Sequence, residues 1–364
     1  MNPIIRNIAR AGLATCSMVG ITSFARRKQS GACILMYHGL SKDNHSGLEN
    51  HSRLHLDIEG FRKSAAVFRK HYHVMSLQDL ADCISAGEDI PQNALVLTFD
   101  DGYASNLHLG LPVLEEYKLH ATVFVSTGFI EGEIFQWPDR IEYAIDKTAE
   151  KTLKLGFDGL PVELNLGSDS AKSRALIQLD EMLKRIPQEQ HLGSISHIEE
   201  RAGASLLNEP NPAEIYRPLS WQQVRELNAS DHASIGAHTH SHPILGRCTP
   251  EFARRDMERC MDLLNSKAGI QNPTFAYPNG KIGDFNTSTE QLLLELGIKV
   301  AVTTEMEFNS SDTNIMRLGR MGTPHNGFQA DTICSGMIPF IENFVAGVMP
   351  DSTPTPEKAY AKSK

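Results

Sequence analysis

The sequence predicts an α/β fold built around a parallel β-sheet. The main observation is that short apolar runs alternate with helical patterns along most of the 364 residues. Six runs are continuously apolar, which is expected of strands that are buried on both faces of a sheet. They cover 32–37, 94–99, 121–125, 233–237, 274–277 and 299–303. This order is typical of a barrel of strands surrounded by helices, either closed or incomplete.

The segments between these strands have the apolar spacing of amphipathic helices. Helices are predicted over 61–71, 77–85, 107–117, 221–228, 251–267 and 289–296. Thr249 and Pro250 mark one helix start, because threonine caps a helix and proline fits its first turn. Ser288 marks another start.

Residues from about 129 to 219 interrupt this order. Within them, 151–166 predicts a β-hairpin that turns at 156–161, and 171–185 predicts a helix. We interpret the region as an insertion into a main domain that spans 30–345. Two roles are open for the insertion, one as a lid or wall for a substrate and one as a purely structural addition.

The two ends of the chain differ from the main domain. Residues 1–29 hold a weakly apolar stretch between basic residues, which is too short and polar to cross a membrane and lacks a clear cleavage site. We expect an amphipathic or targeting segment that contacts a membrane surface or the protein itself. A cytoplasmic or membrane-associated location is therefore favoured over export. Residues 350–364 have the composition of a disordered tail.

The overall composition narrows the class of partner. With 35 Lys and Arg against 44 Asp and Glu, the formal net charge is −9. Nucleic acid is therefore not expected as a partner, because phosphate binding requires a basic face. The six cysteines are scattered without a C-x-x-C pair, which is typical of buried thiols and not of a disulfide framework.

Ionisable residues follow directly after three of the predicted strands. His38 follows 32–37, the pair Asp100-Asp101 follows 94–99, and His238 follows 233–237. Parallel strands end at the same edge of a sheet, so we expect these side chains to lie close together. The sequence Asp-Asp-Gly alone is common in turns. At a strand end, however, one carboxylate can bind a metal while its neighbour transfers protons.

A second cluster, residues 238–243, reads His-Thr-His-Ser-His-Pro. By itself it is either a surface cluster or a metal site in which His238 and His242 are ligands on a helical turn or a tight loop. On a helical turn, His240 would point away from both. One carboxylate and two imidazoles leave coordination positions open for water and substrate, which is the layout of a catalytic metal site.

These motifs closely resemble those of the polysaccharide deacetylase family, also called the NodB-homology domain or carbohydrate esterase family 4. Residues 98–102 match its T-F-D-D-G motif, and 238–243 match H-[ST]-x-x-H-P in the same order. The resemblance covers roughly 30–330 and implies a deformed (β/α) barrel. It is closest to the poly-N-acetylglucosamine deacetylase subgroup, which carries a Tyr-His pair like Tyr37-His38 at the end of the first strand.

The resemblance implies a role for each residue of the two motifs. Asp101, His238 and His242 hold a divalent metal ion, with Zn as the first choice and Co, Ni or Mn as alternatives. Asp100 is the general base that takes a proton from a metal-bound water. The backbone N–H of Tyr103 stabilises the oxyanion.

The sequence departs from the family in three other motifs. In the third motif, Ala276 replaces the arginine that normally orients the base, and the Pro-Gly turn is kept. Tyr277 and Pro278 of this motif are expected to contact the substrate. The fourth motif has no clear match. In the fifth motif, Arg320 replaces the histidine that normally acts as general acid.

The general acid must therefore come from elsewhere. His38 is our first candidate, because the histidine at this place in the subgroup is thought to replace the missing one. A packed or hydrogen-bonded structural histidine is the other reading of His38. His325 is a weaker candidate for the acid. Arg317 or Arg320 could instead bind a carboxylate or orient Asp100.

The predicted function is the metal-dependent removal of acetyl groups from the N-acetylated sugars of a polysaccharide or another glycan. Two alternatives are a sugar O-acetyl esterase, since the same centre attacks either carbonyl, and a glycan-binding module that keeps the metal without catalysis. A full set of metal ligands with a base favours the enzyme. Trp137 and Trp221 could offer aromatic surfaces to sugar rings, although Trp221 fits a core position better.

Overall fold

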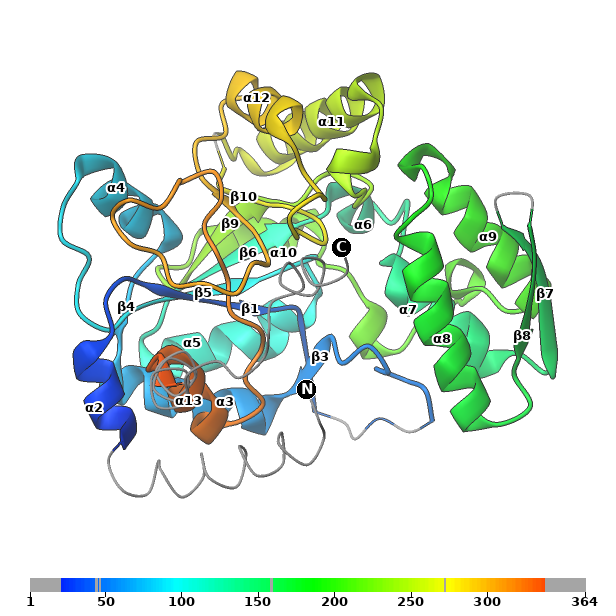
Figure 1. Cartoon of the computed structure of the whole chain (residues 1–364), viewed down its shortest axis with the longest axis horizontal. Helices are drawn as coiled ribbons and strands as arrows, with labels where there is room; N and C mark the ends of the chain where they lie inside the picture. Colours follow the sequence, from blue (N-terminus) through cyan, green and yellow to red (C-terminus); the bar gives the residue numbers. More distant parts are fainter. Residues whose placement is uncertain (1–20, 43–44, 46, 158–159, 272, 338–364) are drawn as a thin grey trace, which may run out of the picture.

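The computed structural model describes residues 21–337, apart from 43–44, 46, 158–159 and 272 (Figure 1). Most of the predicted N-terminal segment, the predicted domain end at 345 and the predicted tail lie outside the described residues and stay predictions. The described end of the first segment is a helix, α2 (Ile21–Lys28), with three basic residues in its last turn. Among the described residues, no helix is long and apolar enough to cross a membrane.

A parallel sheet occupies the centre of the main domain, with its strands in the order β1-β5-β6-β9-β10-β11 and with β4 also paired to β5. The strands are β1 (Cys33–Tyr37), β4 (His73–Val74), β5 (Ala94–Phe99), β6 (Ala121–Val125), β9 (Ala233–Ala237), β10 (Phe275–Ala276) and β11 (Ala301–Val302). Every residue of β5 and β6 is buried, as their continuous apolar runs predicted. The predicted α/β barrel class is confirmed.

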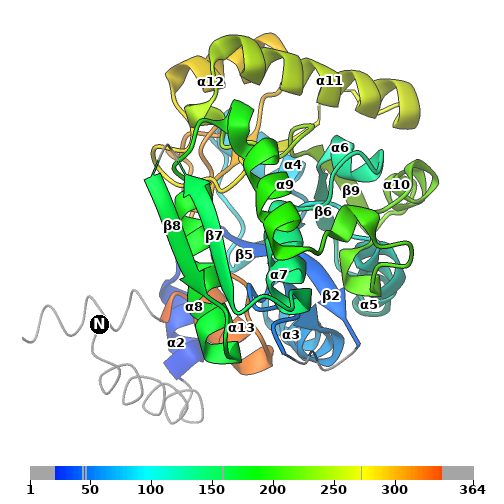
Figure 2. The same cartoon turned by 90° about the vertical axis from the view of Figure 1, so that its right-hand side faces the viewer.

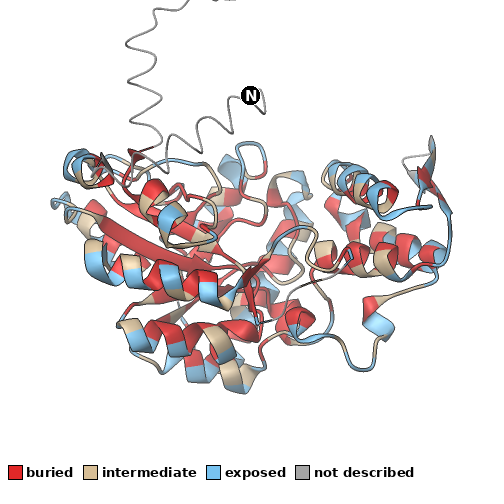
Figure 3. Ribbon diagram, turned by 90° about the horizontal axis from the view of Figure 1, so that it is seen from below, coloured by how far each residue is buried: buried red, intermediate tan, exposed pale blue. Residues whose placement is uncertain are grey.

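Helices cover the outside of this curled sheet (Figures 1 and 3). They are α3 (Ile58–His71), α4 (Leu77–Ala86), α5 (Leu111–Tyr117), α10 (Trp221–Asn228), α11 (Pro250–Ala268), α12 (Thr287–Glu295) and α13 (Gly327–Cys334). Thr249 caps α11 as predicted, with its side chain accepting from the N–H of Phe252. The predicted start of α12 is two residues too late: Asn286, and not Ser288, is its cap. A π-helical turn, η1 (Asn106–Gly110), precedes α5.

A short irregular segment, 318–321, joins the last strand of the sheet to the first. Leu318 bridges to Val302 of β11, and Met321 bridges to Leu35 of β1, both in parallel fashion. Backbone hydrogen bonds fix both sides, at 3.0 Å from the Leu318 N–H to the Ala301 carbonyl and at 2.8 Å from the Met321 N–H to the Ile34 carbonyl. We call 318–321 the closing segment, because it completes the ring of the barrel.

The predicted insertion forms a helical layer with a hairpin beside the barrel (Figures 1 and 2). It contains α6 (Thr127–Ile130), α7 (Trp137–Lys147), β7 (Thr152–Phe157), β8 (Leu160–Asn165), α8 (Asp169–Leu183) and α9 (His191–Ala202). The antiparallel β7–β8 pair is the predicted hairpin. Apolar residues of α7, α8, α9 and the hairpin form a hydrophobic cluster separate from that of the barrel, and Figure 3 shows these two groups of buried residues.

Shorter elements complete the described chain. A two-stranded parallel sheet, β2 (Gly39–Ser41) and β3 (His55–Asp57), follows β1. The 3₁₀ turns are η2 (Gln188–Gln190), η3 (Leu206–Asn208), η4 (Glu214–Tyr216) and η5 (Leu245–Arg247). His51 and Ser52, just before β3, lie beside the insertion, because their N–H groups donate to the Glu142 carboxylate of α7 at 2.6 and 3.1 Å.

Candidate metal centre and active site

The three predicted metal ligands lie together at the carboxyl ends of β5 and β9. Asp101 Oδ1 is 3.7 Å from His238 Nε2 and 3.4 Å from His242 Nε2, and the two Nε2 atoms are 3.2 Å apart. One ligand atom from each residue lies within 4.8 Å of the others. These separations allow all three atoms to bind one ion, which agrees with the sequence prediction.

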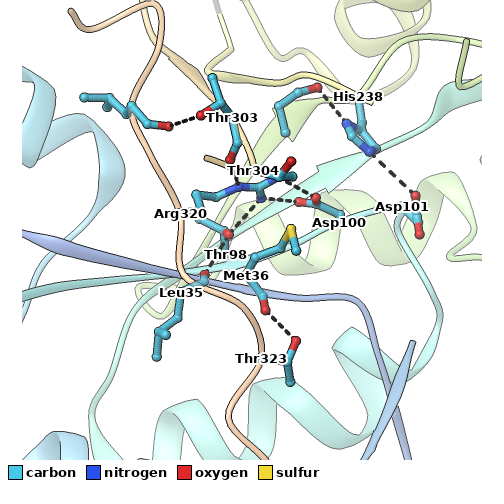
Figure 4. Close-up of polar contacts among 12 residues, drawn as sticks. Leu35, Met36, Thr98, Asp100, Asp101, His238, Thr303, Thr304, Arg320 and Thr323 are labelled. Atoms are coloured by element: carbon cyan, nitrogen blue, oxygen red, sulfur yellow. Dashed lines mark hydrogen bonds and ion pairs between the residues drawn. The ribbon is translucent and has the colours of Figure 1, made fainter. Parts of the chain in front are cut away.

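The orientation of His238 suits a metal ligand. Its Nδ1 atom is 2.7 Å from the carbonyl oxygen of Ala276, at the end of β10, so Nδ1 carries the proton and donates it (Figure 4). The other nitrogen, Nε2, is then left with a free lone pair that faces Asp101. A backbone carbonyl bonded to the far ring nitrogen is a common way to fix the tautomer of a metal-binding histidine.

The predicted ligands His238 and His242 lie on a tight loop and not on a helical turn. Thr239 and His242 both have positive φ angles, 66° and 56°. Within this loop the Thr239 hydroxyl accepts from the His242 N–H at 3.0 Å. The His240 side chain turns away toward Thr127 and Glu133, at 3.0 and 3.1 Å.

The chemistry of these residues fits a cation. Burial lowers the pKa of both His238 and His242, so both imidazoles are neutral at neutral pH, as metal ligands must be. Burial and the neighbouring carboxylates Asp100 and Asp139 raise the pKa of Asp101 well above its usual value. Its Oδ1 atom is buried without a hydrogen-bond partner in the described residues. A cation at this point would satisfy that oxygen and favour the ionised carboxylate.

Arg320 of the closing segment holds the Asp100 carboxylate (Figure 4). Two guanidinium nitrogens donate to the two carboxylate oxygens, at 2.7 and 2.8 Å. The remaining donors of Arg320 reach the Thr303 carbonyl at 2.8 Å and the Thr98 hydroxyl at 3.1 Å. The arginine is 1% exposed and Asp100 is 3% exposed, so this is a buried, two-point ion pair.

This ion pair decides the protonation state of Asp100. Burial alone would raise the Asp100 pKa, but the charge and hydrogen bonds of Arg320, together with the nearby imidazoles, hold the pKa well below its usual value. Asp100 is therefore ionised at neutral pH and able to accept a proton. Of the two arginines that the sequence left open, Arg320 binds and orients Asp100, whereas Arg317 pairs with Glu290 at the surface.

His38 lies beside this base, at the end of β1. It lines the same cavity as Asp100, Asp101, His238 and His242. Burial lowers the pKa of His38 to about 4, with Asp100 opposing the shift and Arg320 adding to it. The free site therefore holds His38 as a neutral imidazole. The alternative candidate, His325, is exposed and does not line the cavity.

The predicted substrate-contacting residues differ in whether they line the cavity. Tyr277 lines the cavity and stacks on Phe285 with ring centres 4.3 Å apart. Pro278 is buried and does not line the cavity. The Tyr103 side chain is buried and donates a hydrogen bond to Asp139 of the insertion at 2.9 Å. Next to it, the Ala104 N–H donates to the Arg217 carbonyl and the Leu219 N–H donates to the Gly102 carbonyl, around the Tyr103–Pro218 bridge.

The cavity has a volume of about 630 Å³, which lies in the usual range for small-ligand sites. One wall is the insertion, which contributes Trp137 and Glu142 of α7 and Ile177 of α8. The substrate-wall reading of the insertion is therefore the one that the geometry favours. Trp221 does not line the cavity; its indole N–H donates to Glu131, and its ring packs against the barrel core.

Sequence reasoning missed the contacts between the insertion and the first motif. Asp139 accepts from Tyr103 and lies 4.0 Å from His55 Nε2, and both side chains are buried. The motif Trp137-Pro138-Asp139-Arg140 was read only as a possible sugar surface. The charged residues after Trp137, within an otherwise apolar helix face, were the signal that could have revealed a buried polar contact.

Comparisons with known proteins agree with this geometry. A family model described as polysaccharide deacetylase matches residues 87–301, more than half of the chain. The match contains Asp100, Asp101, His238 and His242, whereas His38 and Arg320 lie outside it. No curated protein matches the sequence.

Two solved structures share the fold. The deacetylase PplD from Streptococcus pyogenes, solved in complex with acetate, is 19% identical with a TM-score of 0.55, over 84% of this chain and 97% of that one. IcaB from Ammonifex degensii is 18% identical with a TM-score of 0.53, over 84% and 98%. With the family model and the two matched motifs, this fold leads to one conclusion: the chain belongs to the polysaccharide deacetylase family and is an enzyme that deacetylates glycans.

Proposed function

We propose that this enzyme is a metal-dependent N-deacetylase that hydrolyses the acetamido groups of N-acetylated sugars. The observation that carries the proposal is the position of Asp100. Its carboxylate is kept ionised by Arg320 and lies next to the ligand set of Asp101, His238 and His242. A base beside a metal-binding triad is the arrangement that amide hydrolysis by water requires.

The metal would be held by Asp101 Oδ1 and by the Nε2 atoms of His238 and His242. A divalent ion bound there, with Zn as the first choice, would supply a Lewis acid for the acetyl carbonyl and for the attacking water. The neutral imidazoles and the unpartnered carboxylate oxygen support this assignment.

The remaining steps are assigned to residues of this chain. Asp100 accepts a proton from the water that attacks the acetyl carbon. The N–H of Tyr103 donates to the oxyanion that forms. His38 then carries the proton to the sugar nitrogen, so that acetate and a free amine result. Burial lowers the pKa of His38 to about 4, so its imidazole is neutral in the free site and can accept that proton.

A single experiment tests the N-deacetylase. The purified chain is supplied with Zn, Co or Mn, and acetate release is measured from N-acetylglucosamine oligomers and, in parallel, from O-acetylated sugars. We expect release from the N-acetylated oligomers. Asp100→Asn should bind the metal as the wild type does but lose turnover by roughly 10²- to 10⁴-fold, the usual contribution of a general base.

The substrate comparison also separates the alternatives. Release from O-acetylated sugars alone would make the enzyme an esterase. Absence of acetate release from every glycan with every metal would overturn the proposal. An Asp100→Asn variant with normal turnover would refute the assigned base while leaving the reaction intact.

A further inference from the structure

The loop that carries His238 and His242 adopts a costly backbone conformation. Thr239, with a φ angle of 66°, is a β-branched residue in the left-handed region, where such residues are rare. His242, with a φ angle of 56°, is a second case. Each such residue is strained and persists only where the surrounding structure holds it. Contacts outside the loop must therefore maintain this shape.

Asp256 of α11 supplies the largest set of such contacts. Its Oδ2 atom accepts from the His240 N–H at 2.8 Å, and its Oδ1 atom accepts from the Ser241 N–H at 3.0 Å and from the Ser241 hydroxyl. Asp256 is 7% exposed and pairs with no lysine or arginine among the described residues. The donors that satisfy this buried carboxylate therefore all come from the metal-binding loop.

Helix α6 holds the opposite side of the loop. The Thr127 N–H donates to the Thr239 carbonyl at 3.1 Å, and the Gly128 N–H donates to the His240 carbonyl at 2.9 Å. The approach at Gly128 is so close that a Cβ atom there would lie 2.6 Å from the His240 oxygen. The loop is thus fixed between α6 and α11 through its middle residues, and the imidazoles at its two ends face Asp101.

We infer that Asp256 is a positioning residue that preorganises His238 and His242 for the ion. Its carboxylate accepts from the successive N–H groups of His240 and Ser241. This contact imposes the left-handed φ angles of the two residues on either side, Thr239 and His242. Without that anion, the loop would relax toward ordinary φ angles, and the Nε2 atoms of His238 and His242 would no longer face the same point. This inference rests on the proposed metal role of the pair.

The test is the affinity of the full chain for Zn²⁺, measured by competition with a chromophoric chelator. Asp256→Asn keeps the size of the side chain but places an amide N–H₂ among N–H donors. We expect a dissociation constant 10- to 100-fold weaker than that of the wild type, the usual effect of losing a partner that orients the ligands. Asp262→Asn is the matched control, because Asp262 is an exposed carboxylate on the same helix; its affinity should equal that of the wild type.

Ser241→Ala provides a milder variant that removes only the hydroxyl contact with Asp256, so a smaller loss of affinity is expected. It decides the question if Asp256→Asn does not yield folded protein by circular dichroism. Wild-type affinity in a folded Asp256→Asn chain, or in Ser241→Ala when the former does not fold, would overturn the inference. Failure of the wild type itself to bind metal would instead overturn the proposed function, so the two failures are distinguishable.

Discussion

Arg320 contacts both oxygens of Asp100 from the segment that closes the barrel, 220 residues later in the chain. The sequence has Ala276 where the resemblance to the family leads one to expect an arginine, and Arg320 brings a guanidinium to Asp100 from another segment of the chain. Because the pair is buried and joined by two hydrogen bonds, it fixes both the charge and the direction of the Asp100 carboxylate.

Replacing Arg320 by lysine should reduce kcat much more than it changes KM. Lysine keeps the positive charge but cannot form two parallel hydrogen bonds, so Asp100 loses its fixed orientation. We expect kcat for acetate release to fall on the order of 10²-fold. Arg317→Lys is the control, because Arg317 pairs with Glu290 at the surface. Equal kcat values for the two variants would show that Arg320 does not orient the base.

His38→Ala tests the proposed proton carrier. With N-acetylated oligomers we expect kcat to fall by roughly 10²- to 10⁴-fold, because the amine nitrogen must be protonated to leave. With an aryl acetate, whose leaving group needs no proton, the loss should be much smaller. His325→Ala, an exposed histidine outside the cavity, should behave like the wild type in both assays. A similar loss on both substrates would assign His38 a structural role.

Removal of the metal should abolish turnover and lower stability together. A chelated sample should regain activity on addition of Zn²⁺, and at a concentration 100-fold above Kd the ion should add about 2.7 kcal/mol to the free energy of unfolding. His242→Ala should show neither effect at that concentration. The control His240→Ala should show both, since the His240 ring faces Thr127 and Glu133. Normal metal stabilisation of His242→Ala would contradict the assigned site.

Glu142 should make stability depend on pH. Burial first, and then the charge of Asp139, raise its pKa from 4.5 to about 7. The folded state thus binds a proton that the unfolded state has lost, so this stabilisation is complete below about pH 4.5 and disappears as pH rises through 7. From pH 5 to pH 8 the contribution lost is on the order of 3 kcal/mol. In urea titrations Glu142→Gln should show a shallower decline over this interval; an unchanged decline would exclude Glu142 as its source.

The insertion should affect substrate binding through its exposed wall. Ile177 lines the cavity and is 56% exposed, so Ile177→Ser removes apolar surface without opening the core. We expect KM for longer oligomers to rise several-fold, corresponding to about 1 kcal/mol, while kcat and the melting temperature stay unchanged. Leu207→Ser, at an exposed position of the insertion outside the cavity, is the control. Equal KM values would leave the insertion with a structural role only.

The strands and the clustering of Asp101, His238 and His242 could be predicted because both follow from local signals. Continuous apolar runs gave β5, β6 and β9 with their bounds, and the ionisable residues that end β5 and β9 meet as parallel strands require. The hairpin of the insertion followed from its turn residues in the same way.

Other features depend on contacts between residues far apart in the chain, so no local sequence pattern could predict them. The closing segment is too short to show a strand pattern, so the choice between Arg317 and Arg320 stayed open until their partners were known. The bond from Tyr103 to Asp139 crosses from the barrel to the insertion. The turn at Thr239 is imposed by Asp256, 17 residues further on, against the preference of threonine itself.

The closing segment has a consequence for the order in which the enzyme acquires its activity. Every proposed metal ligand lies before residue 243, and the strands are complete at Val302, but the guanidinium that keeps Asp100 ionised arrives only with Arg320. A chain that ended after β11 would therefore contain all three candidate metal ligands, but its Asp100 would lack the arginine partner. Under the proposed mechanism, activity then requires the completed barrel, because closure of the ring brings that charge to Asp100.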